Sequence, residues 1–308
     1  MPKIKVILNP LAGKGHAARI SPMIAREFTA LGADFDLVHT TARGDAINLA
    51  RQALDDGFDI IVGVGGDGTS HEVVNGMMTH ANGGGPIGTL GCIPAGSGND
   101  FAVMAGAQTD VAAACKQIVG NATRLVDVGE VTLDGRAKRY FDNAVGVGFD
   151  GLVTIACMHY KYVRGLALYL PAVLETVFCR MKRTRVRIEY DGQVIEQNNM
   201  MTVIANGPRE GGGFLVAPQA QVNDGAFDLV VAQAMPKLQV LGLIPAFLKG
   251  THVGDPRIQI VQARHVVMTS DDPLYPHIDG EILLEKVHRV ETRMIPGALR
   301  MIAPAGGN

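Results

Sequence analysis

The chain has 308 residues, enough for two ordinary domains, with 28 basic and 30 acidic side chains and a net charge of −2 at pH 7. This balance excludes a global field that would draw the protein to nucleic acid or to an anionic membrane. Aromatic residues make up only 5%, without any Trp, which argues against a base-stacking surface. The four cysteines show no regular spacing, which favours buried thiols in a reducing compartment.

Short apolar strands alternate with helical patterns over the first third of the chain. Such an alternation predicts the α/β class, with a mostly parallel sheet covered on both faces. Ligands in such sheets bind beyond the carboxyl ends of the strands. In chain order the predicted elements are a strand at Ile4–Leu8, a helix at Ala17–Leu31, a strand at Phe35–His39, a helix at Asp45–Asp55, a strand at Ile60–Val64, a helix at Glu72–Thr79 and a strand at Ile87–Ile93.

The pattern changes after about Val126. One helical stretch, roughly Gly151–Arg180, is followed mainly by strands. Asp191-Gly192 between two of them favours a type I′ hairpin turn. The series predicts a second domain built as an antiparallel β-sandwich. Its predicted strands are Val186–Tyr190, Gln193–Glu196, Met201–Ala205, Phe227–Ala232, Ile258–Val261, His265–Thr269 and Ile282–Lys286.

The segment Gly65-Gly66-Asp67-Gly68-Thr69 directly follows a buried strand. Its bare backbone N–H groups and the adjoining helix N-terminus can surround a phosphate. Thr69 and Glu72 have the spacing of a capping box. A carboxylate at Asp67 would repel a phosphate unless a cation lay between them, so the loop predicts Mg²⁺ and a nucleoside triphosphate. The alternative is a Gly-rich turn in which Asp67 is a surface cap.

The same segment satisfies G-x-G-x-x-G through Gly63, Gly65 and Gly68. A dinucleotide-binding fold places an acid about 20 residues further on to hold the ribose. Between Glu72 and Asp100 there is no Asp or Glu, which excludes NAD binding of that type.

Two further Gly-containing loops follow predicted strands, at 9–15 and at 94–100. The first lacks the Gly spacing and the Ser or Thr of a Walker A loop. The second offers Ser97 and Asn99 as hydrogen-bonding groups. Either loop alone is as readily a simple turn. Three such loops at successive strand ends of one sheet favour a shared nucleotide site.

These loops, together with the late Asp279-Gly280-Glu281, resemble the diacylglycerol kinase catalytic-domain family, which includes bacterial lipid kinases, sphingosine kinases and ceramide kinases. The resemblance extends over nearly the whole chain. It implies an ATP-binding α/β domain at 1–126, a lipid-binding β-sandwich domain at 127–290, and a C-terminal segment, 291–308, that returns to the first domain.

The resemblance also implies roles for individual residues. Glu281 would be the general base, with Asp67 as the other catalytic carboxylate, and either could take the proton. Asp279-Gly280 by itself is also an ordinary hairpin turn. A structural Mg²⁺ would be held by the Asp224 carboxylate and the carbonyl groups of Gln221 and Ala226. The implied ATP contacts are Asn9, Pro10, Leu11, Ala12, Gly13, Thr41, Gly66, Asp67, Gly68, Thr69, Ser70, His71, Glu72 and Ser97.

The most apolar stretch, Leu166–Leu174, is half the length of a membrane span and contains Pro171. Basic residues on either side of it, from Lys161 to Arg187, fit either an interfacial lipid-binding surface or a solvated basic face. The expected partners are ATP and a membrane lipid, reached by transient peripheral contact from the cytoplasm. No nucleic acid is expected, and a homodimer is left open.

The sequence therefore predicts a Mg²⁺-dependent kinase that converts ATP and a lipid alcohol to ADP and a lipid phosphate. Diacylglycerol, giving phosphatidic acid, is the first expected substrate. Phosphatidylglycerol, a sphingoid base, or a soluble substrate as in NAD kinase are the alternatives. A protein that senses ATP without chemistry is the alternative from another class.

Overall fold

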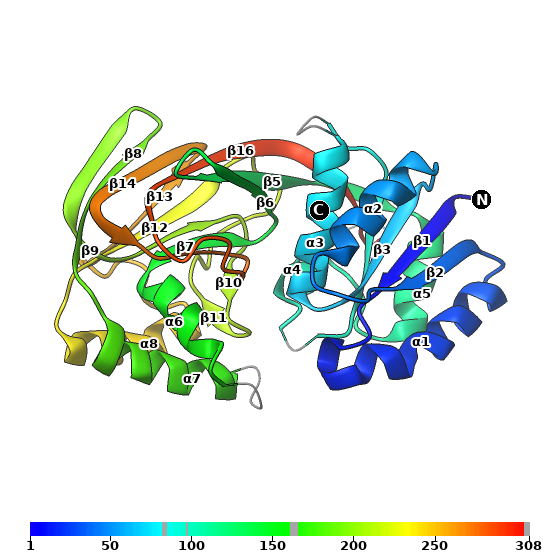
Figure 1. Cartoon of the computed structure of the whole chain (residues 1–308), viewed down its shortest axis with the longest axis horizontal. Coiled ribbons are helices and arrows are strands. Elements are labelled where there is room, and N and C mark those ends of the chain that lie inside the picture. The colour runs from blue at the N-terminus through cyan, green and yellow to red at the C-terminus, as the bar shows by residue number, and fades with distance from the viewer. Residues whose placement is uncertain (82–84, 97, 161–165, 305–308) are drawn as a thin grey trace. The chain divides into compact units, whose positions relative to one another are not determined.

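The computed structural model describes residues 1–81, 85–96, 98–160 and 166–304 (Figure 1). The chain divides into two compact units. Unit 1 comprises Met1–Val128 and Ile295–Asn308, and unit 2 comprises Gly129–Met294. Each unit is described separately below.

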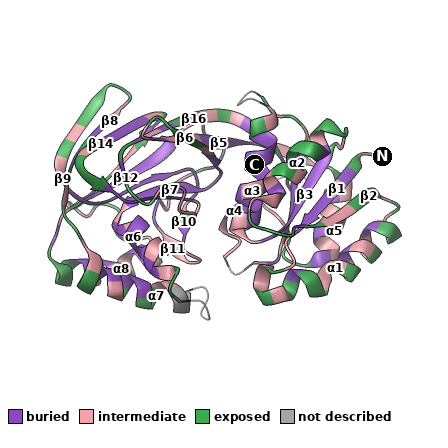
Figure 2. Ribbon diagram, viewed as in Figure 1, coloured by how far each residue is buried: buried purple, intermediate pink, exposed green. Residues whose placement is uncertain are grey.

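Unit 1 contains a parallel sheet in the order β4-β3-β1-β2, with the end of β16 beside β4 through Met301 and Leu90. Every residue of β3 is buried, as expected for an apolar strand covered on both faces (Figure 2). The predicted α/β class is confirmed. The elements are β1 (Lys3–Leu8), α1 (Ala12–Ala30), β2 (Asp34–His39), α2 (Asp45–Asp55), β3 (Ile60–Gly65), α3 (Asp67–His80), β4 (Thr89–Pro94), α4 (Asp100–Met104) and α5 (Val111–Gly120).

Four of the helices of unit 1 pack as two pairs. Buried residues of α1 and α5 share one apolar cluster with β1 and β3. In the other pair, α2 and α3 approach closely at Gly76, where an added Cβ would lie 2.4 Å from the carbonyl oxygen of Ile47. A larger residue at Gly76 would therefore push α2 away from α3.

Unit 2 is built mainly from antiparallel strands whose inner faces enclose one apolar cluster, while its helices pack on a second. The predicted β-sandwich is confirmed. The elements are β5 (Thr123–Leu133), β6 (Ala137–Phe141), β7 (Ala144–Gly148), α6 (Phe149–Cys157), α7 (Leu166–Glu175), the π-helix η1 (Thr176–Arg180), β8 (Thr184–Tyr190), β9 (Gln193–Ala205), β10 (Arg209–Glu210), β11 (Phe214–Leu215), β12 (Phe227–Gln233), α8 (Lys237–Lys249), β13 (Ile258–Ala263), β14 (His265–Leu274), β15 (Pro276–Ile278) and β16 (Val287–Ile302).

The β8–β9 hairpin has the predicted turn, with φ of 42° at Asp191 and 84° at Gly192. The strand predicted at Ile282–Lys286 is wrong, because the chain there is irregular and β16 begins only at Val287. The helical stretch predicted at roughly Gly151–Arg180 contains α6, α7 and the π-helix η1, which directly follows α7. Helix α8 was not predicted, since its sequence is apolar on every side and lacks the polar face that marks a surface helix.

Candidate functional site

The three Gly-containing loops of unit 1 contact one another at the carboxyl ends of β1, β3 and β4. The amide of Asn9 in the first loop donates to Thr69 Oγ1 of the second at 3.2 Å. Gly13 lies against the third loop, where an added Cβ would be 2.3 Å from the carbonyl oxygen of Ala95. Gly13 also has a φ of 58°. Glycine is needed at this position for both reasons.

The second and third loops touch at two glycines. A Cβ on Gly96 would lie 2.3 Å from the Cα of Gly66, so any side chain would force the loops apart. Gly66 is also the residue before α3 and has no side chain that could accept a hydrogen bond from the first helical turn. The backbone N–H groups and the positive end of the helix dipole are therefore arranged as in anion-binding helix N-termini.

Asp67 joins the second loop to the third. Its Oδ2 accepts a hydrogen bond from the backbone N–H of Asn99 at 2.8 Å, and its Oδ1 accepts one from Phe101 at 3.3 Å. These bonds cap the start of α4. Gly98 allows this approach, because a Cβ there would be 2.6 Å from Asp67 Oδ2. The carboxylate thus acts as a helix cap, and its acceptor oxygens are of the kind that bind divalent cations.

The predicted capping box at Thr69 and Glu72 is wrong. Helix α3 already begins at Asp67, so both residues lie within it. Glu72 instead caps the neighbouring helix α2, accepting from the backbone N–H groups of Gly44 at 2.8 Å and Ala46 at 3.1 Å. The capping-box spacing was present in the sequence, but the helix begins three residues earlier than that box requires, with Gly66 as its N-cap, and Glu72 has a different partner.

Thr41 lies at the start of the same α2 helix. Its backbone N–H and its Oγ1 donate to Asp45 Oδ2 at 2.7 and 2.5 Å. The hydrogen bonds from Thr41, followed by the one from the backbone of Ala42, lower the pKa of the exposed Asp45 carboxyl. Thr41 is therefore linked to the glycine loops through α2, whose first turn is bonded to Glu72 of α3.

The other predicted ATP contacts differ in position and in burial. Pro10 and Leu11 belong to the first loop, and Ala12 is the first residue of α1. The side chains of Ser70 and His71 are buried, with Ser70 Oγ 4.0 Å from Cys92 Sγ and His71 beside Asn75. A ligand in the loops would meet their backbone first. Ser97 lies outside the described residues.

In unit 2, Glu281 follows a two-residue turn. Ile278 and Glu281 exchange backbone hydrogen bonds of 2.9 and 2.8 Å. The turn residues Asp279 and Gly280 have φ of 48° and 77°, which is the type I′ geometry. The backbone therefore adopts the hairpin turn that the sequence allowed at this point.

The turn is fixed by the Asp279 side chain. Its two carboxylate oxygens accept hydrogen bonds from three successive backbone N–H groups, those of Asp142 at 3.1 Å, Asn143 at 3.1 Å and Ala144 at 2.8 Å. Glu281 therefore extends from a turn that is anchored to the start of β7.

A second support comes from His277, which sequence reasoning missed. Its Nδ1 accepts a hydrogen bond from the backbone N–H of Gly280 at 3.1 Å. The tautomer assigned from this geometry carries its proton on Nε2, which lies 2.8 Å from Asp150 Oδ2 and donates to it. Glu210 Oε1 lies 3.9 Å from the same nitrogen. Gly146 leaves room for the His277 ring, because a Cβ at Gly146 would lie 2.3 Å from His277 Nε2.

Asp150, Glu210 and His277 are close enough to suggest a metal centre. The tautomer argues otherwise, since a protonated Nε2 has no lone pair to offer a metal. Burial raises the pKa of the Asp150 carboxyl, but His277 and a hydrogen bond from Glu210 outweigh this and hold that pKa below its ordinary value. The three side chains form a hydrogen-bonded support beneath the turn.

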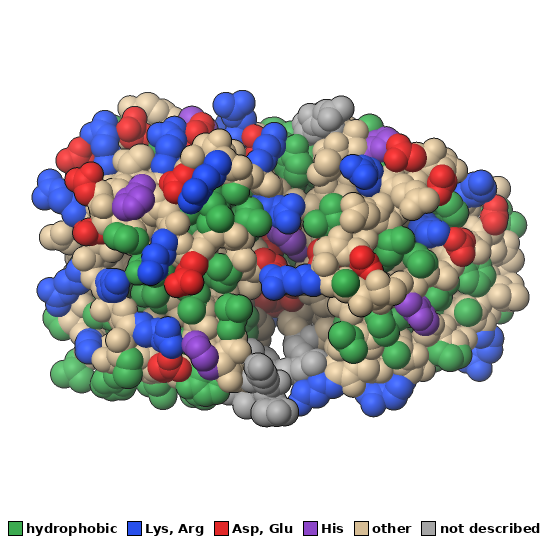
Figure 3. All heavy atoms as spheres, viewed as in Figure 1, with side chains coloured by type: hydrophobic (Ala, Val, Ile, Leu, Met, Phe, Trp, Pro, Cys, Tyr) green, Lys and Arg blue, Asp and Glu red, His purple; other side chains and the backbone are tan. Residues whose placement is uncertain are grey.

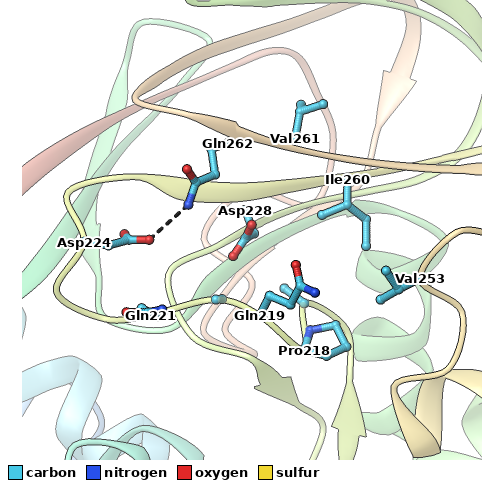
Figure 4. Close-up of a pocket in the computed structure, with 11 residues that line it drawn as sticks. Pro218, Gln219, Gln221, Asp224, Asp228, Val253, Ile260, Val261 and Gln262 are labelled. Atoms are coloured by element: carbon cyan, nitrogen blue, oxygen red, sulfur yellow. Dashed lines mark hydrogen bonds between the residues drawn. The ribbon is translucent and has the colours of Figure 1, made fainter. Parts of the chain in front are cut away.

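The predicted metal residues Gln221 and Asp224 line a pocket of about 770 Å³ in unit 2 (Figure 4). Asp224 Oδ1 accepts from the backbone N–H of Ala226 at 3.1 Å, and Oδ2 accepts from Gln262 Nε2 at 3.1 Å. Asp224 and Gln221 therefore lie at the same pocket, while Ala226, the third predicted ligand, is bonded to Asp224 but is not among the residues that line it.

Asp228, on β12, also lines this pocket, and sequence reasoning missed it. Its side chain points into the pocket beside Asp224 (Figure 4), although the residue is only 8% exposed. Among the described residues, its carboxylate has no hydrogen-bond partner. Burial and then the charge of Asp224 raise its pKa. Two carboxylates in this setting suit a divalent cation. The sequence did carry a signal for this residue, because Asp228 is the one acidic residue in the otherwise apolar segment Phe227–Ala232.

Two family models match the chain in succession. The diacylglycerol kinase catalytic domain matches residues 3–131, and the YegS C-terminal NAD kinase beta sandwich-like domain matches residues 143–303. The diacylglycerol kinase of Bacillus subtilis is 30% identical over 91% of this chain and 90% of its own length. That of Mycobacterium tuberculosis is 28% identical over 99% and 96%.

Solved structures agree with these matches. A Bacillus anthracis protein described as a candidate diacylglycerol kinase superimposes with a TM-score of 0.80 at 26% identity, over 98% of this chain and 97% of its own. Within the described residues, no helix is long and apolar enough to cross a bilayer.

Proposed function

The chain belongs to the diacylglycerol kinase family, and on this premise we propose that it transfers the γ-phosphate of ATP to the hydroxyl of a membrane lipid. Diacylglycerol is the proposed substrate and phosphatidic acid the product. The observation that supports this most directly is the convergence of three glycine loops at the α3 N-terminus, where Asp67 joins two of them.

In unit 1, the three glycine loops, at 9–15, 65–69 and 94–100, would surround the phosphates of ATP, with Thr41 and Glu72 near α2. Backbone N–H groups and the helix dipole supply the positive field that the phosphates require. Asp67 would place Mg²⁺ on the phosphates through its carboxylate oxygens. Ser97 would add a hydroxyl from the third loop.

In unit 2, Glu281 would accept the proton of the lipid hydroxyl while the hydroxyl oxygen bonds to the γ-phosphorus and ADP leaves. Phosphoryl transfer depends mainly on positioning and charge neutralisation. The anchoring of the Glu281 turn by Asp279 and His277 supports this role, because a general base must be held within hydrogen-bond reach of its proton. Asp67 remains the alternative acceptor.

A second divalent cation would be held in the pocket of unit 2. The proposed ligands are the carboxylates of Asp224 and Asp228 together with the carbonyl groups of Gln221 and Ala226. Mg²⁺ bound there would replace the missing partner of the buried Asp228. Its role would be structural.

The experiment is incubation of the protein with γ-labelled ATP, Mg²⁺ and a total bacterial lipid extract, followed by separation of the labelled lipids. Label in phosphatidic acid supports diacylglycerol. Label in another lipid phosphate keeps the lipid kinase activity and changes the substrate to phosphatidylglycerol or a sphingoid base. In a parallel incubation with NAD in place of the lipid extract, label in NAD phosphate supports a soluble-substrate kinase. ATP binding without transfer in either incubation supports a sensor. Fractionation of cells would test the proposed cytoplasmic, membrane-peripheral location.

A further inference from the structure

Helix α7 and the π-helix η1 are apolar on the outside as well as on the inside. Leu170, Leu174 and Phe178 follow one another at four-residue spacing and are 41%, 39% and 57% exposed. Between them, Val173 and Val177 are buried in a core cluster of unit 2. A helix that is apolar all round is normally covered on every side, so its outer face calls for a further partner.

Helix α8 repeats this arrangement. Val240 and Phe247 are buried in the same core cluster as α7, while Leu238 is 81% exposed. The Nζ of Lys237 donates to the carbonyl oxygen of Phe178 at 2.7 Å, which ties the start of α8 to η1. In Figure 3, hydrophobic side chains gather along the edge of unit 2 where Figure 1 places α7 and α8.

The charge around these helices is strongly basic in a chain whose net charge is −2. Residues 166–185 and 237–250 contain a single acid, Glu175, and its carboxylate is bonded to Arg180 at 2.7 Å. Two of the bases, Arg183 and Lys249, are exposed and belong to no ion pair among the described residues. The basic residues of these two segments are Arg180, Lys182, Arg183, Arg185, Lys237 and Lys249.

We propose that these residues form a membrane-docking face that seats the protein on an anionic bilayer. The face is defined by Leu170, Leu174, Phe178 and Leu238 with Arg183 and Lys249. It rests on the proposed function, since a lipid kinase must reach its substrate at the bilayer surface. Apolar side chains enter the boundary between headgroups and acyl chains, while Lys and Arg meet anionic headgroups.

A second copy of the chain fits this face less well. A two-fold contact places the same patch on both sides, so each set of basic residues would face another of equal charge. Like charges brought together across an interface oppose association. An anionic lipid surface complements both the apolar and the basic parts.

The apolar part is tested by co-sedimentation with vesicles of phosphatidylcholine and phosphatidylglycerol in equal parts. The double variant Phe178→Glu/Leu238→Glu is expected to bind at least roughly tenfold more weakly than the wild type, because two large apolar side chains no longer enter the lipid. Val194→Glu is the control, since Val194 is 49% exposed on β9 outside this face. Its binding is expected to match the wild type.

The basic part is tested with Arg183→Gln/Lys249→Gln on the same vesicles at low salt. Binding is expected to weaken about fivefold per charge removed, and vesicles of phosphatidylcholine alone are expected to show no such loss. Arg264→Gln, a change at an exposed residue between β13 and β14 that is not part of this face, serves as the charge control.

Activity toward a short-chain diacylglycerol dissolved as monomers separates docking from catalysis. The docking variants are expected to phosphorylate it at wild-type rates. Wild-type vesicle binding by both double variants would overturn the proposal, as would a wild-type dimer that Phe178→Glu converts to a monomer. If the wild type binds vesicles but phosphorylates no lipid, the proposed function fails while the docking face stands.

Discussion

The His277 side chain has two distinct hydrogen bonds, and two substitutions separate them. His277→Asn keeps an acceptor near Gly280 but loses the donor to Asp150, whereas His277→Gln offers a donor toward Asp150 and loses the acceptor at Gly280. We predict that the Gln variant lowers kcat roughly tenfold with an unchanged KM for ATP, because the turn before Glu281 shifts. Steady-state kinetics measures both. A wild-type kcat in the Gln variant would contradict the positioning role.

The buried Asp228 carboxylate leads to a prediction about how stability depends on pH and on Mg²⁺. Because its folded-state pKa is raised, ionising it costs stability as pH rises above its ordinary value of 3.8. Asp228→Asn is therefore expected to raise the melting temperature of the chelator-treated protein at neutral pH and to reduce the further rise that Mg²⁺ produces. Each kcal/mol corresponds to about 2–4 °C in a protein of this size. Thermal denaturation with and without Mg²⁺ measures it, and an equal Mg²⁺ response in both proteins would argue against this site.

At the level of elements, the glycine loops hold the unit 1 site together. Gly96→Ala is predicted to weaken ATP binding at least tenfold, because its Cβ would lie 2.3 Å from Gly66 Cα and separate the second loop from the third. Gly85→Ala is the matched control, since a Cβ at Gly85 meets no atom within 4 Å. Calorimetric titration with ATP compares them. Equal affinities for the two variants would show that the loop contact is unimportant.

The sequence predicts the elements of unit 1 well for a physical reason. The period of apolar residues marks buried strands such as β3, and glycine marks places of close backbone approach such as Gly66. It fails where the partner is distant. His277 and Asp150 are 127 positions apart, and Glu72 caps a helix that precedes its own. Local spacing carries no information about such contacts.

At the level of the whole molecule, the chain leaves unit 1 along β5 and returns through β16. The last segment is bonded within unit 1, since Asp127 accepts from the backbone N–H of Gly297 at 2.7 Å and Met301 pairs with Leu90. Deleting residues 295–308 is predicted to speed hydrogen exchange in β4 more than in β12, because β4 loses a neighbouring strand. Mass spectrometry of exchanged peptides measures this. Equal acceleration in both strands would contradict it.

The central claim, phosphoryl transfer to a lipid hydroxyl assisted by Glu281, is tested most directly by the initial rate at which γ-labelled ATP labels diacylglycerol with Mg²⁺ present. The wild type is predicted to label it, and Glu281→Gln is predicted to be slower by about 10²–10⁴-fold while binding ATP equally well. Label that enters only a water-soluble product, or a Glu281→Gln rate equal to the wild type, would contradict the account.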